Sequence, residues 1–380
     1  MNEQNIYTVP EEYKETWDSG ITHAITQKSA GLTNIATCIS CDGDYHEMTS
    51  VGTLQINERT ARHERLPEGQ EPKFGNRRFY KNAFAAFAKL SKDDFKFKGR
   101  FPLAMNMMHD LLADAAAPYP DRCLLGVTDP KEEYRGNCLI DTATRGSTEA
   151  DTSPYGGRRE GLMGINWTGL NGTTPEVLPQ QPLINGALAT SYTKYANSLD
   201  GIDPKKSNVI PYNYALTGTP VGSGFVEGKV RGLKYFLQKR FINSWGEFCM
   251  AVTPWQMAEI EDTEKWQNKD FRDSFKVQDD GSYISSLLGL RLVVTPDVPI
   301  VNIGTESDQK WVRACPVWRK SSLIFGTWQN PEYNLFPLQE TYYDSVGCTI
   351  QFAYGAGRRR VEDVLVMHCE EPELDGISIA

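Results

Sequence analysis

The chain has 380 residues, a formal net charge of −9, 40% apolar residues and 11% aromatic residues. This composition is sufficient for one large domain or for two or three smaller ones, and it is far from that of a disordered chain. The acidic balance argues against nucleic-acid binding as the main task, because such binding depends on Lys and Arg that neutralise phosphates. The apolar runs are too short to cross a bilayer and Met1–Asn5 shows no signal pattern, so we expect a soluble protein that stays where it is made.

The first predicted helix begins at Thr8. Pro10 in the first turn and Glu11 three residues after Thr8 form a capping-box pattern. Apolar residues then recur every four positions, at Tyr13, Trp17, Ile21 and Ile25. Because a single helix has no core of its own, we expect this stripe to pack on the rest of the subunit or on a neighbouring copy.

The segment from Ser40 to Arg78 is rich in charges and poor in large apolar residues. Its charged residues include Arg59, Arg62, Arg65, Arg77, Arg78, Glu47, Glu58, Glu64, Glu68 and Glu71. Thr49–Ile56 alternates as a strand does, but the segment cannot bury enough surface to fold alone. Two interpretations are open: an exposed loop, or a long two-stranded arm held by ionic contacts with another subunit.

Two helices are predicted next. Lys81–Lys92 is a short helix candidate, and Pro102–Ala117 is the strongest helix because its apolar residues share one face. Pro118 and Pro120 are expected to end or kink this second helix. From Thr128 to Gly222 the sequence is rich in Gly, Pro, Ser, Thr and Asn, which predicts an irregular, β-rich insertion.

Helices and strands alternate after this segment. Phe225–Arg240 is predicted to be an amphipathic helix, Cys249–Val252 a short strand, and Pro254–Ile260 the start of another helix. Leu290–Val294 reads as a buried strand. This alternation indicates a mixed α/β domain.

Two strand-like blocks occupy the C-terminal part. In Val346–Tyr354, large apolar side chains alternate with smaller or polar ones. Gly355 and Gly357 are expected to permit a tight reversal, so that Val361–His368 returns as the second strand of a hairpin. The arginines at this turn are expected to face a neighbour or solvent rather than a core; they are Arg358, Arg359 and Arg360.

No segment of the sequence has the complete residue spacing of a known catalytic, cofactor-binding or metal-binding motif. The glycines around Lys229 miss both phosphate-loop patterns, which would need glycine where Glu227 or Ser223 stands. Cys38 and Cys41 have metal-ligand spacing without a second pair at the right distance. Five histidines offer little general-base chemistry, and the eight cysteines lie mostly in apolar contexts. We therefore predict no catalytic residue, no cofactor, no metal site and no disulfide framework.

Over Phe225–Glu371, the order of elements and several short motifs resemble the major capsid proteins of tailed bacteriophages with the Hong Kong 97-type fold. The matching motifs are Ala251–Val252–Thr253, Trp255–Gln256, Leu288–Gly289–Leu290, Pro316–Ser321, Gly326, Trp328, Gln329 and Tyr354–Gly355. The N-terminal third matches more loosely, at Gln27–Lys28–Ser29 and Arg77–Arg78–Phe79.

This resemblance implies an α+β fold with named parts. They are an N-terminal arm at 1–40, an extended β-hairpin loop at 41–80, a peripheral domain with a long spine helix at 81–127, an axial domain at 223–330, and C-terminal strands at 331–380 that return to the peripheral domain. The β-rich, irregular insertion at 128–222 is longer than the family leads us to expect.

The resemblance also implies a function. The chain would be a structural protein, not an enzyme, that self-assembles as pentamers and hexamers into an icosahedral head shell around double-stranded DNA. Scaffolding, portal and cement proteins are the further partners implied, with no membrane and no specific DNA binding; the shell would assemble in the host cytoplasm and become part of the virion. The candidate subunit-interface residues are Trp17, Arg59, Arg62, Glu64, Arg65, Arg358, Arg359 and Arg360. Two alternatives stay open: an encapsulin-like compartment, which shares the fold but encloses enzymes, and a soluble α/β enzyme with an unrecognised site.

Overall fold

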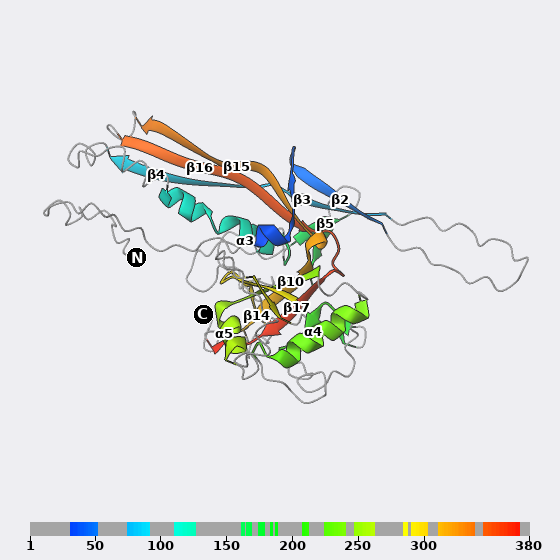
Figure 1. The fold of residues 1–380 in the computed structure, drawn as a ribbon. Coiled ribbons are helices and arrows are strands. Elements are labelled where there is room, and N and C mark those ends of the chain that lie inside the picture. The colour runs from blue at the N-terminus through cyan, green and yellow to red at the C-terminus, as the bar shows by residue number, and fades with distance from the viewer. Residues whose placement is uncertain are drawn as a thin grey trace, which may run out of the picture.

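The computed structural model describes residues 31–51, 74–91, 110–126, 161–163, 165–168, 174–178, 183–184, 187–188, 207–212, 224–240, 247–262, 284–287, 290–302, 311–338 and 345–372. The helix predicted from Thr8 lies outside the described residues, as does most of the strand predicted over Thr49–Ile56. Figure 1 shows a long sheet in one layer, a second sheet with helices in another, and a smaller sheet near their junction.

The long sheet contains four strands in the order β1-β15-β16-β4. Their bounds are Thr37–Ser40 for β1, Leu323–Leu338 for β15, Ser345–Arg358 for β16 and Asn82–Ser91 for β4. The alternation predicted for Val346–Tyr354 is confirmed, because Cys348, Ile350 and Phe352 are all buried. The Phe352 ring meets the ring of Tyr119 at 5.6 Å between centroids, so this face of the sheet packs against a helix.

The helix predicted over Lys81–Lys92 is wrong, because this stretch forms β4. The strand pairs antiparallel with β16 over its whole length. Phe84, Ala86 and Ala88 pack against the core, while the residues between them are exposed. A spacing of two is the strand period, and the pairing with β16 outweighs the helix preference of the alanines.

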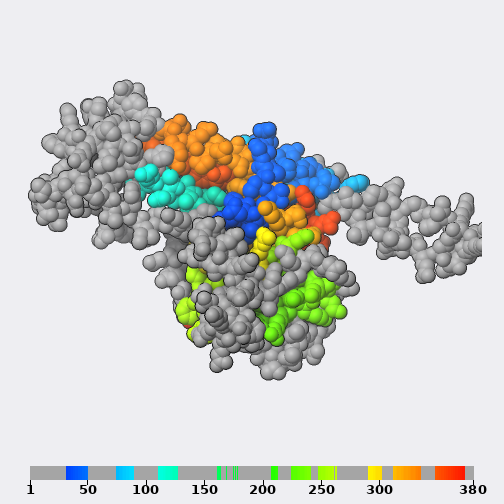
Figure 2. Space-filling view, in the orientation of Figure 1, coloured from blue at the N-terminus to red at the C-terminus, as the bar shows by residue number. Residues whose placement is uncertain are grey.

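The helix predicted over Pro102–Ala117 is confirmed for its described part, since residues 110–116 are helical. A turn separates it from the short helix α3, Tyr119–Leu125. Pro118 is the N-cap of α3 and Pro120 lies in its first turn, where a missing N–H breaks no helical hydrogen bond. The space-filling view shows these helices running along the long sheet (Figure 2). None of the described helices is long and apolar enough to span a membrane.

The second sheet has seven strands, with β13 paired to β14 beside the path β11-β12-β10-β14-β17-β9. Their bounds are Ile284–Leu287 for β11, Leu290–Val294 for β12, Phe248–Val252 for β10, Ile300–Asn302 for β13, Trp311–Arg319 for β14, Val364–Cys369 for β17 and Val209–Ile210 for β9. The helices α4, Glu227–Arg240, and α5, Pro254–Glu261, lie beside it (Figure 1). The four elements predicted between Phe225 and Val294 are thus confirmed. A capping box of Thr253 and Gln256 starts α5, as its local sequence requires.

The C-terminal hairpin prediction is wrong, because β16 and β17 belong to different sheets. The strand β16 continues through both glycines to Arg358. A Cβ on Gly355 would lie 2.6 Å from the carbonyl oxygen of Tyr80, and one on Gly357 would lie 2.7 Å from a ring carbon of Phe79. These glycines therefore permit close approach of β3 to the sheet rather than a reversal of the chain.

The smaller sheet has the order β2-β3-β5-β6. Its strands are Tyr45–Val51, Phe74–Tyr80, Ile165–Thr168 and Thr174–Val177. The described parts of 128–222 thus contribute β5 and β6 to the smaller sheet and β9 to the second sheet. A separate pair follows, β7 at Leu183–Ile184 and β8 at Ala187–Leu188. Two short 3-10 helices complete the described elements, η2 at Leu32–Ile35 and η5 at Lys320–Ser322.

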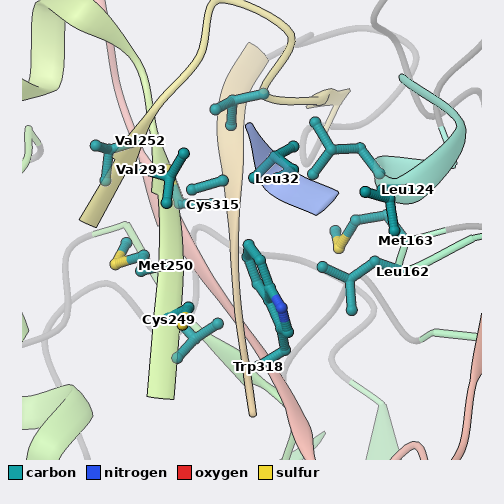
Figure 3. Close-up of a cluster of buried hydrophobic side chains, with 14 of the residues drawn as sticks. Leu32, Leu124, Leu162, Met163, Cys249, Met250, Val252, Val293, Cys315 and Trp318 are labelled. Carbon is teal, nitrogen blue, oxygen red and sulfur yellow. The ribbon is translucent and has the colours of Figure 1, made fainter. Parts of the chain in front are cut away.

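One hydrophobic core connects the layers. Figure 3 shows Trp318 of β14 with Cys249 and Met250 on one side and Leu162 and Met163 on the other. Trp318 is fully buried, and its indole Nε1 donates a 3.1 Å hydrogen bond to a backbone carbonyl in η2. This core therefore contains residues from the N-terminal, middle and C-terminal parts of the chain.

Candidate subunit interface

The β2–β3 hairpin is the described part of the charged segment from Ser40 to Arg78. Its strands pair antiparallel, with Glu47 directly opposite Arg78. The Arg78 Nε lies 3.1 Å from Glu47 Oε2, and its guanidinium lies 4.7 Å from the centre of the Tyr45 ring. Tyr45 is 44% exposed and Phe74 is 65% exposed, so the hairpin presents aromatic surface as well as charge.

A second ion pair connects this hairpin to β6 within the smaller sheet. The Arg77 guanidinium donates two hydrogen bonds to the Glu176 carboxylate, 2.7 Å from Nε to Oε2 and 2.9 Å from Nη2 to Oε1. Its Nη1 also donates to the carbonyl oxygen of Arg359, at 2.9 Å. The hydrogen bond to Glu176 raises the pKa of Arg77 above its ordinary value, in spite of partial burial.

The predicted exposure of Arg358 is wrong, because its side chain is fully buried. Its guanidinium donates to three backbone carbonyls, at 3.2 Å to Gly161, 2.9 Å to Leu162 and 2.8 Å to Glu176. Several donors in one plane allow arginine to bind separate carbonyls at once, which makes its burial tolerable. Arg359 is exposed and Arg360 is half-buried, and their role in an interface stays a prediction.

The remaining candidates lie outside the described residues; they are Trp17, Arg59, Arg62, Glu64 and Arg65. Their role at a subunit interface also stays a prediction. Sequence reasoning missed Glu176, which lies 99 residues from Arg77 and within the segment that looked like an irregular insertion. No local signal in the sequence pairs these two residues.

The glycine and lysine pattern before α4 has a structural explanation. The Lys229 Nζ donates to the carbonyl oxygens of Gly224, at 2.6 Å, and His368, at 3.4 Å. The Lys229 side chain is fully buried, and this burial lowers its pKa. Glu259 accepts a 2.7 Å hydrogen bond from the backbone N–H of Phe225 at the same place. Gly224 lies just before α4 and Gly228 in its first turn.

The cysteines are small buried residues for the most part. Cys38 is exposed, while those that are described elsewhere in the chain are buried and free of disulfides. Within the described ranges, no group of three or more His, Cys, Asp and Glu side chains is arranged to hold a metal ion.

No family model matches this sequence, and no curated protein matches it. Solved structures do match. A chain of the mature capsid of bacteriophage PhiM1 is 12% identical with a TM-score of 0.53, covering 94% of this chain and 92% of that one. For the capsid of cyanophage Pam1 the values are 10% identity, a TM-score of 0.54, and 97% and 99% coverage. For the capsid of Ralstonia phage GP4 they are 11%, 0.53, and 98% and 99%.

At 10% to 12% sequence identity, the structural similarity shows a shared fold. The chain has the α+β fold of phage capsid proteins, and the capsid-type fold that the motifs over Phe225–Glu371 predicted is confirmed. The division of the chain into an arm, a loop and domains stays a prediction.

Proposed function

We propose that this chain is a major capsid protein, a structural subunit that self-assembles into the icosahedral head shell of a tailed phage. One observation carries the proposal. The structural likeness extends over 94% to 98% of this chain and 92% to 99% of chains that form phage capsids. Such coverage leaves out at most 6% of this chain, so it does not depend on one common motif.

The proposed parts follow the described architecture. The β2–β3 hairpin is the base of an extended loop at 41–80 that reaches a neighbouring copy. The long sheet with its helices is the peripheral domain; β4 and the helices come from 81–127, and β16 and the second half of β15 from 331–380. The second sheet with α4 and α5 is the axial domain, whose tip meets its copies in pentamers and hexamers. It combines strands of 223–330 with β17 and β9, so β17 departs from the expectation that the strands of 331–380 return to the peripheral domain.

The proposal includes partners and a location. Further copies of the chain are the main partner, and scaffolding, portal and cement proteins are the others. The shell encloses double-stranded DNA without specific binding, which agrees with the net charge of −9. Assembly takes place in the host cytoplasm and the product is the virion capsid. The role is structural rather than enzymatic.

A shell of this kind needs many modest contacts. An exposed Arg–Glu pair contributes about 0.2–1 kcal/mol, so each contact stays reversible while errors are corrected. Repetition over all subunits then stabilises the closed lattice. The charged segment around Arg59, Arg62 and Arg65 suits such contacts.

Negative-stain electron microscopy tests the proposal. The purified chain is examined over a range of salt and protein concentration, alone and after co-expression with the proteins encoded beside its gene. We expect closed shells or five- and six-fold rings. Monomers or small dimers under every condition would contradict the proposal. Nuclease-protected DNA in particles from the native host indicates a phage head, whereas an enclosed enzyme indicates an encapsulin-like compartment.

A further inference from the structure

The β2–β3 hairpin leaves the rest of the subunit at a defined point. Its two strands pair with each other from Tyr45 and Tyr80 out to Val51 and Phe74. The pairing between β3 and β5, in contrast, includes only Arg78 and Arg77. The strand ladder between β3 and β5 therefore ends at Arg77, with Phe74 at the far end of the described hairpin.

The base of the hairpin is held on the other side by packing. Phe79 is fully buried in a small cluster with Met48 and Ile324. Its ring meets the ring of Trp328 edge-on, at 5.8 Å between centroids. This cluster fixes the hairpin at its root: Phe79 lies on the body side of Arg77 in β3, and Met48 of β2 is the direct cross-strand neighbour of Arg77.

Arg77, Glu176 and Arg358 together form what we call the hairpin-base node. Glu176 is held twice, since its carboxylate accepts both hydrogen bonds from Arg77 and its carbonyl accepts one from Arg358. Arg77 also donates to the carbonyl of Arg359. The node thus joins the hairpin, the strand β6 and the end of β16 at the residue where the ladder stops.

We infer that the hairpin-base node fixes the direction in which the β2–β3 hairpin leaves the subunit, and so sets where the hairpin reaches a neighbouring copy. The first half follows from the contacts alone, and the second half rests on the proposed function. A planar, bidentate pair restrains angles as well as distance, which a single-point contact does not. The Arg77 and Glu176 side chains are only 13% and 27% exposed, so solvent screens the pair less than a surface pair.

The chain supplies a matched control on the same hairpin. The Arg78–Glu47 pair has similar exposure, 15% and 32%, and the same charges. This ion pair joins β2 to β3 within the hairpin, and the Glu47 carboxylate belongs to β2. Glu176→Gln and Glu47→Gln therefore remove one carboxylate charge each, but only Glu176→Gln weakens the node.

Distances between two spin labels, measured by pulsed electron paramagnetic resonance on unassembled subunits, test the first half. The labels are placed at Thr49→Cys on β2 and Gln238→Cys on α4, both exposed positions, after Cys38→Ser and Cys138→Ser. We expect Glu176→Gln to widen the distance distribution by about twofold, Arg77→Lys to have a smaller effect, and Glu47→Gln to leave it unchanged. An unchanged distribution in Glu176→Gln, or equal widening in both Gln variants, overturns the inference.

Electron microscopy of the same variants without labels tests the second half. We expect the yield of closed shells to fall by about tenfold in Glu176→Gln, because each shell repeats the contact many times, and to be normal in Glu47→Gln. Normal shells from Glu176→Gln overturn the second half. If the unsubstituted chain forms no shells either, the proposed function fails, while the distance measurement still decides the first half.

Discussion

The strands β17 and β4 differ in what surrounds them, and the difference separates two kinds of surface in this fold. Every residue of β17 is buried, which requires cover on both faces of the second sheet. Along β4, half-buried residues alternate with exposed ones, so only one face of the strand is covered by the subunit. Substitutions in β17 and its neighbours should therefore affect folding, while those on the outward face of β4 should affect contacts between copies.

The largest effect is expected in the core beside β17. Trp318 on β14 is fully buried, and replacing it with Ala should lower the free energy of unfolding by about 3–5 kcal/mol. Urea denaturation of the unassembled subunit, followed by circular dichroism, measures this loss. Trp255→Ala is the control, because that side chain is 43% exposed and should cost about 0.5 kcal/mol or less. Equal losses in the two variants would contradict this assignment of the core.

Charge reversal of Arg59, Arg62 and Arg65 tests the surface that is predicted to contact neighbouring copies. If these side chains form ion pairs with a neighbour, the triple variant loses about 0.6–3 kcal/mol per subunit contact, and repulsion adds to the loss. We expect assembly to stop while the subunit unfolds at the same urea concentration as before. Light scattering measures assembly, and normal shells from the variant would refute the predicted role.

Protonation of His368, on β17, should change the free energy of unfolding by an intermediate amount. Burial lowers the pKa of His368 to about 3, below the value of about 6.5 for an unfolded chain. As the pH falls below 6.5, the unfolded state binds a proton that the folded state does not, so stability is lost. At pH 5 this loss is about 2 kcal/mol relative to pH 7.

Urea denaturation at pH 7 and pH 5 measures this loss, with His368→Asn as the comparison. Because His368→Asn removes the imidazole and keeps Lys229 in place, the difference between the two proteins isolates the contribution of the histidine. An equal change in stability between the two pH values in both proteins would show that His368 is not the titrating group.

The elements that sequence predicted well are those with local signals. The helices α4 and α5 carry periodic apolar residues and a capping box. In Leu290–Val294, leucine and valine residues flank one exposed arginine, Arg291. The stretch at β4 allows either period, because residues 83–88 are apolar throughout, its alanines suit a helix, and Phe84 and Phe87 have helical spacing. Only the pairing with β16, distant in the sequence, decides between them.

The candidate subunit interface was less predictable, because its contacts also join segments that are distant in the sequence. Gly355 and Gly357 carry a turn signal, but their role is to admit Phe79 and Trp328 against the strand. Arg358 is basic and follows two glycines, but its guanidinium binds carbonyls from residues 161, 162 and 176. Contacts between segments so far apart leave no pattern in a single sequence.

The smallest effect on stability is expected at Ala85, on the outward face of β4. Ala85→Lys should change the free energy of unfolding by about 0.5 kcal/mol or less, since the side chain is exposed. Ala86→Lys is the matched control one position away, where the side chain packs against the core and a charge should cost several times as much. Urea denaturation compares the two. If Ala85→Lys then forms fewer closed shells at unchanged stability, the outward face of β4 takes part in contacts between copies; if the shells are normal, that face is only a solvated surface.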